Sequence, residues 1–343
     1  NQYKEDAWLA GYLNLATDKE QGDLIRHKLM RNHLGGANLA AHYTTSALDL
    51  TFGGSWSYYT CPHWGTLSWV DGLDKGDIGG RWYDNDVTKQ DANAFVRADW
   101  SVFRGLMDNS LHLFADLQYR YVHYKAWGTN DNAIWGDEGV TMQPIDVDQR
   151  YNFLNPRLGI SYIHHRHNLF ASVAVAHREP TRSDFTDRYM FSADDSYPKP
   201  ERLVDFEVGY TYIAPRLSLG INLYYMLNDG DDALNTNVDK SYRRGVELMA
   251  SWRVAKWFTL SANATLSQNK IKDYVDELKD SPTYGENLGD MTISYSPSVV
   301  GSLIADFHIG GFSALWHTQY VGKQYFTNNE IEALSLDGYC VTN

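Results

Sequence analysis

Alternation of apolar and polar residues recurs in segment after segment of this chain, and it constrains the fold more than any other feature. Between Leu111 and Tyr121 the odd positions hold only Leu, Ala and Tyr, whereas the even positions include His112, Asp116, Gln118 and Arg120. Successive side chains of a β-strand point to opposite faces. Each such strand therefore presents one apolar face and one charged face, and the pattern indicates a sheet that separates two unlike environments.

The alternating segments are joined by connections that are short and long in turn. We predict strands at 33–44, 47–60, 91–104, 110–127, 150–164, 168–178, 201–213, 216–227, 241–254, 257–271, 293–308 and 312–326. A thirteenth strand begins near Gly338, and residues 1–12 are read as the stub of an earlier one. The long, polar connections are 61–90, 128–149, 179–200, 228–240, 272–292 and 327–337. In an up-and-down barrel, alternate turns lie at the same end, and short turns opposite long loops are typical of outer-membrane barrels.

Composition agrees with a barrel that crosses a membrane. Aromatic residues make up 14% of the chain and gather near both ends of the apolar faces, as the two interfaces of a bilayer require. No apolar run of about 18 residues exists, so the sequence excludes a transmembrane helix. The net charge of −13 argues against a nucleic-acid partner. A soluble β-sandwich is the alternative, but its strands are usually much shorter than these. We predict an all-β, antiparallel, up-and-down transmembrane β-barrel.

Several short motifs resemble one known family. They are Asn155–Gly159 (NPRLG), Arg178–Arg182 (REPTR), Pro200–Tyr210 (PERLVDFEVGY), Asn222–Tyr225 (NLYY) and Arg243–Glu247 (RRGVE). Their order resembles the barrel of TonB-dependent outer-membrane receptors, most closely the Bacteroidetes-type versions. The resemblance implies a 22-stranded barrel, a plug domain inside it, and a location in the outer membrane with many crossings.

The chain departs from that pattern in its extent. We expect residues 1–343 to be a partial receptor barrel with about 12 complete strands, because both ends look cut from something longer. The plug domain and the final strands of the family are expected to lie outside this sequence. The resemblance implies contact with the TonB energy-transducing complex through the missing N-terminal region, contact with outer-membrane lipid, and a surface lipoprotein as a further candidate partner.

The function that this resemblance implies is TonB-energised uptake of a scarce nutrient. We favour an iron-siderophore or a similar iron complex as the ligand, with haem, cobalamin and oligosaccharide as alternatives. A passive porin is the second hypothesis, because the mixed charge on the lumen face suits either a water channel or a plug. An enzyme is the third and least favoured, since no pair of carboxylates is brought together and no hydrolase motif is present. No cofactor is expected.

Candidate binding residues lie in the long connections. The substrate-binding candidates are His63, Trp64, Trp82, Trp127, Trp135, Arg178 and Arg182. Aromatic rings could stack on a ligand, or they could pack on one another, which we favour. The two arginines could hold an anion, but we favour pairing with Glu179, Asp184 or Asp187. The histidines of the 164–167 turn could bind a metal, yet a solvated turn is favoured. Cys61 and Cys340 are read as unpaired thiols.

Overall fold

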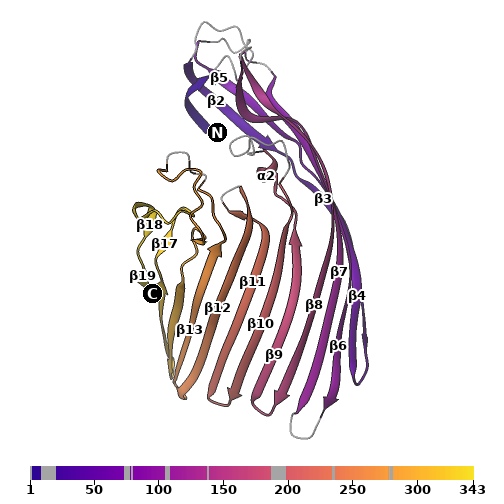
Figure 1. The fold of residues 1–343 in the computed structure, drawn as a ribbon, viewed down its shortest axis with the longest axis vertical. Helices are drawn as coiled ribbons and strands as arrows, with labels where there is room; N and C mark the ends of the chain where they lie inside the picture. The colour runs from indigo at the N-terminus through magenta and orange to yellow at the C-terminus, as the bar shows by residue number, and fades with distance from the viewer. Residues whose placement is uncertain are drawn as a thin grey trace.

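The computed structural model describes residues 2–8, 21–72, 78, 80–104, 109–136, 139–186, 198–233, 236–276, 278 and 281–343. Most of the described chain forms one antiparallel sheet of 17 strands (Figure 1). The strands of its first half are β1 (Gln2–Trp8), β2 (Gln21–Met30), β3 (His33–Thr44), β4 (Leu48–Thr60), β5 (His63–Val70), β6 (Arg81–Arg104), β7 (Ser110–Gly136), β8 (Gly139–His164) and β9 (His167–Arg178). Those of its second half are β10 (Glu201–Ala214), β11 (Leu217–Ala233), β12 (Thr236–Ala255), β13 (Phe258–Ile271), β14 (Met291–Thr292), β15 (Val299–Ile309), β16 (Phe312–Val321) and β19 (Tyr339–Thr342).

Four small elements complete the secondary structure of the described residues. A short helix, α2 (Arg182–Thr186), follows β9, and a 3-10 turn spans Glu332–Leu334. Strands β17 (Gln324–Tyr325) and β18 (Ser335–Leu336) pair with each other away from the large sheet. No helix in the described part of the chain is long and apolar enough to cross a membrane.

Strands that follow one another in sequence pair with one another along the wall. From β6 to β13 every pair is antiparallel and joins sequential neighbours, and β15, β16 and β19 continue the series. At the other side, β3 pairs with β4 and β4 pairs with β6. Figure 1 shows the result as an open, curved wall whose short turns lie together at the lower end. The predicted up-and-down antiparallel architecture is confirmed.

The strands extend further toward the long-loop end than the sequence analysis predicted. The predicted loops 61–90, 128–149 and 228–240 are wrong in large part, because β5, the start of β6 and the hairpins β7/β8 and β11/β12 occupy them. Strand β2 was not predicted either. It continues into β3 across Arg31–Asn32, and β4 continues into β5 across Cys61–Pro62. The two junctions are neighbours, because the Arg31 amide donates to the Pro62 carbonyl (3.2 Å). In part of these extensions the pattern is reversed, because in β8 the apolar residues Ile145 and Val147 are buried on the lumen face and Asp146 and Asp148 are exposed.

The two faces of the wall differ as the alternation indicates. Large apolar side chains of the predicted outward sets are exposed, among them Leu117 at 43% and Tyr119 at 48%. Near the short turns the same face exposes Tyr43, Trp100, Tyr162, Trp252 and Phe312, and toward the long loops it exposes Trp56, Tyr58, Tyr225 and Tyr320. A continuous exposed apolar face with aromatic residues at both ends fits lipid contact.

On the opposite face, which we call the lumen face, aromatic rings lie over glycines of the neighbouring strand. Phe114 faces Gly159, and Phe170 faces Gly209, as direct cross-strand partners. A Cβ added to Gly209 would lie 2.0 Å from Phe170 Cε1, and one at Gly159 would lie 2.1 Å from Phe114 Cζ. These pairs explain why one apolar ring interrupts the polar face of β7 and another that of β9: each ring lies over a glycine of the neighbouring strand.

Candidate ligand-binding site at the long-loop end

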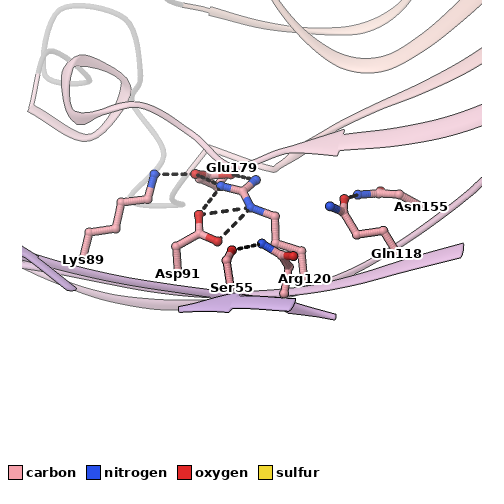
Figure 2. A network of polar contacts seen from close by, with 8 residues as sticks. Ser55, Lys89, Asp91, Gln118, Arg120, Asn155 and Glu179 are labelled. Atoms are coloured by element: carbon pink, nitrogen blue, oxygen red, sulfur yellow. Dashed lines mark hydrogen bonds and ion pairs between the residues drawn. The ribbon is translucent and has the colours of Figure 1, made fainter. Parts of the chain in front are cut away.

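A network of charged residues lies on the lumen face where β9 ends (Figure 2). Glu179, just beyond β9, accepts hydrogen bonds from Lys89 Nζ (2.5 Å) and from Arg120 Nη1 (2.8 Å) and Nη2 (2.9 Å). Arg120 also donates to Asp91, with Nη2 2.5 Å from Oδ2. Burial alone would raise the pKa of Glu179, but the hydrogen bonds from Lys89 and Arg120 lower it to about 2. Glu179 is therefore held as a carboxylate.

The residues of this network come from three different elements. Lys89 and Asp91 belong to β6 and Arg120 to β7, whereas Glu179 opens the connection between β9 and β10. Two further hydrogen bonds involve neighbouring residues: Asn93 donates to Ser55 Oγ (2.5 Å). Asn155 donates to Gln118 Oε1 (3.0 Å), beside the network in Figure 2. The network therefore fixes the start of the β9–β10 connection against the inner side of β6 and β7.

Helix α2 continues this inward path through apolar contact. The ring of Phe185 stacks on Tyr124 of β7, with centroids 5.3 Å apart and an interplanar angle of 11°. Gln143 of β8 donates a hydrogen bond to the Thr186 carbonyl (2.9 Å). Around Phe185 a buried cluster is formed by Val87, Val122, Tyr124, Ala126, Ile145, Val147, Tyr151 and Phe153. The segment 179–186 is thus packed on the lumen face instead of projecting outward.

The guanidinium group of Arg182 forms a hydrogen bond through one of its two terminal nitrogens. Its Nη2 donates to Asn85 Oδ1 (2.9 Å), whereas Nη1 is buried with no hydrogen-bond partner among the described residues. His63 lies nearby, and burial together with the positive charge of Arg182 lowers its pKa. Burial raises the pKa of Tyr124, which the same positive charge opposes. Two of the predicted binding residues, His63 and Arg182, therefore belong to one neighbourhood.

A second buried guanidinium lies above it. Arg26 of β2 is only 7% exposed, its Nε has no partner in the described structure, and its Cζ lies 5.7 Å from the centroid of the Trp82 ring. Trp82 in turn makes an edge contact with Tyr83, with centroids 4.6 Å apart. Burial raises the pKa of Tyr83, and the charges of both Arg182 and Arg26 act against that rise. Buried guanidinium nitrogens without partners are costly, so an anionic group would stabilise each of these two arginines.

The other predicted binding residues occupy different places. The Trp64 ring of β5 lies under the Arg81 guanidinium, 4.7 Å from Cζ to the ring centroid. Trp127 is on the outward face of β7, 38% exposed and covered by Lys125. Trp135 is in β7, but its side chain lies outside the described residues. A ligand-binding role for these residues stays a prediction.

The favoured pairing partners of the two arginines need correction. Arg178 forms an ion pair with Glu201 across β9 and β10, and Arg182 uses Asn85. Glu179 pairs with Lys89 and Arg120, and Asp184 accepts from the Thr181 amide. Asp187 lies outside the described residues. Sequence reasoning missed the role of Glu179 because its partners are 59 and 90 positions away, and only the strand register brings them together.

Metal chemistry finds no support in the described residues. No group of three or more His, Cys, Asp or Glu side chains gathers there in a way that could hold a metal ion. The histidines of the 164–167 segment lie at the short turn between β8 and β9, where the sequence analysis placed them. Cys61 is buried and Cys340 is exposed, and both are free thiols.

Comparison with known proteins identifies the class. The sequence model of the family described as "TonB dependent receptor-like, beta-barrel" matches residues 2–343. The chain belongs to this family of transport receptors. No curated protein sequence matches it significantly.

Solved structures of similar fold agree with this assignment. They include the ferric yersiniabactin uptake receptor FyuA from Yersinia pestis (15% identity, 93% of this chain and 47% of that one, TM-score 0.63). The siderophore receptor PiuA from Acinetobacter baumannii gives 11% identity, coverage of 94% and 50%, and a TM-score of 0.67. The copper transporter OprC gives 14% identity, coverage of 92% and 48%, and a TM-score of 0.69. The chain thus spans about half the length of the structures it matches.

Proposed function

We propose that this chain is the barrel portion of a TonB-dependent outer-membrane receptor that takes up a scarce, anionic metal complex, with a ferric siderophore as the favoured ligand. Three observations support this proposal. The chain belongs to the family of TonB-dependent receptor barrels, one face of its sheet is apolar and exposed, and the segment 179–186 packs on the lumen face at the long-loop end. In the complete receptor a plug domain would fill the lumen, and TonB would act on that plug. A surface lipoprotein partner stays a prediction.

The observation that carries the choice of ligand is the pair of underused guanidinium groups. Arg182 and Arg26 each keep a buried nitrogen without a partner in the described structure, on a chain whose net charge is −13. Carboxylate or catecholate oxygens would satisfy these nitrogens, and charge-assisted hydrogen bonds to Arg are among the strongest in proteins. The Trp82 and Tyr83 rings beside Arg26 offer faces on which an aromatic ligand group can stack. Similar folds include receptors for ferric siderophores and a copper transporter, which is in keeping with a metal complex.

The test uses the complete receptor gene in a Gram-negative strain that lacks its own siderophore receptors. Uptake of radioactive iron is measured for a panel of ferric siderophores, with and without TonB. We expect uptake of at least one anionic complex, lost when TonB is removed. Uptake that persists without TonB would support the passive porin instead.

A substitution in the site sharpens this test. Arg182→Gln should weaken uptake mainly by raising the half-saturating ligand concentration, because it removes the charge that contacts the anion. The matched control is Arg150→Gln, which removes an exposed arginine on the outward face of β8. Equal uptake by the two variants would contradict the assignment of Arg182.

A further inference from the structure

Three consecutive short turns each carry one basic residue at the tip. They are Arg166 between β8 and β9, Arg216 between β10 and β11, and Lys256 between β12 and β13, and all three side chains are exposed. We call these three residues the basic turn row. The strands that separate the turns are paired neighbours, so adjacent tips stand about 10 Å apart along the rim. Figure 1 shows these turns at the lower end of the wall, opposite the candidate binding site.

Backbone hydrogen bonds hold the three turns in equivalent positions. The carbonyl of Arg166 accepts from the Ile213 amide (2.8 Å), and the carbonyl of Arg216 accepts from the Arg253 amide (2.8 Å). Trp257, next to Lys256, accepts from the His308 amide in the same way (2.8 Å). Each turn is therefore tied to the beginning or end of the next strand pair, so the backbone positions of the three basic residues form a fixed row.

The row has no counter-charge of its own. Segments 163–168, 213–218 and 254–259 contain no Asp or Glu, although the chain as a whole carries a net charge of −13. None of the three basic side chains makes an ion pair with a residue that the structure describes. The local positive charge therefore remains available to an anionic partner.

An aromatic band lies directly beside the row on the outward face. Tyr162, Tyr210, Trp252 and Trp257 are all at least 36% exposed there. The hydroxyl of Tyr210 is 2.7 Å from His167 Nδ1, so the band and the turn are in contact. Tyr and Trp side chains prefer the headgroup level of a bilayer, and flexible Arg and Lys side chains beyond them reach toward the lipid phosphates.

We propose that the basic turn row binds the phosphate groups of anionic phospholipids and holds this sector of the barrel at a fixed depth in the membrane. The inference rests on the proposed membrane location but concerns a surface at the other end of the wall from the ligand site. The occupant is a lipid, because the row continues an apolar, aromatic face that water-soluble partners would leave exposed.

The test is native mass spectrometry of the complete receptor released from detergent micelles, titrated with phosphatidylglycerol and, separately, with zwitterionic phosphatidylcholine. The variant R166Q/R216Q/K256Q removes the row. Because one Lys or Arg near an anionic surface contributes about a five-fold change in affinity, we expect phosphatidylglycerol to bind at least about ten-fold more weakly. Phosphatidylcholine binding should not change.

Two further variants keep the result interpretable. R166K/R216K/K256R retains the charges and should bind like the wild type, which separates charge loss from misfolding. R150Q/K240Q/K272Q removes three exposed charges toward the long-loop end and should leave phosphatidylglycerol binding within about two-fold of the wild type. An equal loss of phosphatidylglycerol binding in this control would overturn the proposal. The proposal would also be overturned if soluble glycerol phosphate, at the same concentration as the lipid, displaced phosphatidylglycerol. Failure of the wild-type receptor to enter lipid nanodiscs would overturn both this inference and the membrane location.

Discussion

Replacing Glu179 by Gln should release the inward-packed segment 179–186 from the lumen face. The Glu179 side chain is only 9% exposed and accepts hydrogen bonds from Lys89 and Arg120. Its pKa falls from 4.5 to about 2, and at about 1.4 kcal/mol per pKa unit this corresponds to about 3 kcal/mol. Gln keeps one acceptor oxygen, so we expect the free energy of local opening of this segment to fall by about 2 kcal/mol, which raises the population of the open form about 30-fold.

Hydrogen–deuterium exchange of the complete receptor measures this opening. The amides of residues 182–186 should exchange about 30-fold faster in Glu179→Gln than in the wild type, with little change in the wall strands. The control is Glu201→Gln, which removes a carboxylate from the pair with Arg178, whose side chain is 56% exposed. That change should alter the free energy of opening of residues 182–186 by at most about 0.5 kcal/mol. Equal exchange in the wild type and Glu179→Gln would refute the reasoning.

The same contact predicts a pH dependence. The folded pKa of Glu179 is depressed, so its contribution is fully present above about pH 4.5 and is lost as the pH falls toward 2. Protection of residues 182–186, corrected for intrinsic exchange rates, should therefore decline over this window in the wild type. In Glu179→Gln the decline should be absent. A decline of the same size in both proteins would assign the pH effect to another group.

Three further predictions test the wall itself. Leu260→Arg, on the outward face of β13, should lower the free energy of unfolding in lipid by about 2–4 kcal/mol. Asn263→Gln, on the lumen face, should lower it by less than about 1 kcal/mol. Equal losses would mean that the faces are assigned wrongly. Gly209→Ala should cost about 1–3 kcal/mol because its Cβ would meet the Phe170 ring, and Phe170→Leu in the same chain should recover part of this loss, as thermal unfolding would measure. With Cys340 replaced by Ser, a thiol reagent applied to intact cells should label Tyr284→Cys in the long connection and spare Gly311→Cys in a short turn; labelling of both would contradict the orientation.

Alternation was a good guide to strands that have one exposed apolar face, although the strands predicted at 293–308 and 312–326 are shorter and span 299–309 and 312–321. The prediction for β3 matches the structure at both ends, and those for β9 and β10 differ by one residue at one end. Residues 63–70 and 128–136 continue the sheet although their polar residues follow no period of two, so the sequence predicts a loop there. For such extensions the ladder of backbone hydrogen bonds carries the structure, and no sequence pattern reports it.

The candidate site was predicted only in part. His63 and Arg182 were singled out and do lie near each other, because residues rich in hydrogen-bond donors and rings were sought in the long connections. Arg26 was not singled out, since β2 itself was missed. Pairings such as Lys89 with Glu179 depend on the register of several strands and on the inward path of the β9–β10 connection. Both are tertiary properties that single-sequence reasoning does not reach.

The extension of β5, β6, β7 and β8 toward the long-loop end has a consequence for the proposed recognition of a ligand. His63 and Asn85, two residues of the proposed site, are partners in a hydrogen-bonded ladder, whereas Arg182 lies on α2. A ligand bound beside this ladder would order little backbone, so the entropy cost of binding would be small. The connections 272–292 and 327–337 hold only short strand pairs, but backbone hydrogen bonds such as Tyr274 N to Gly289 O (2.9 Å) and Asp276 N to Glu286 O (3.0 Å) also order the first of them. The proposed site would therefore have an ordered backbone on both sides, and its selectivity for a ligand would come from the positions of its side chains.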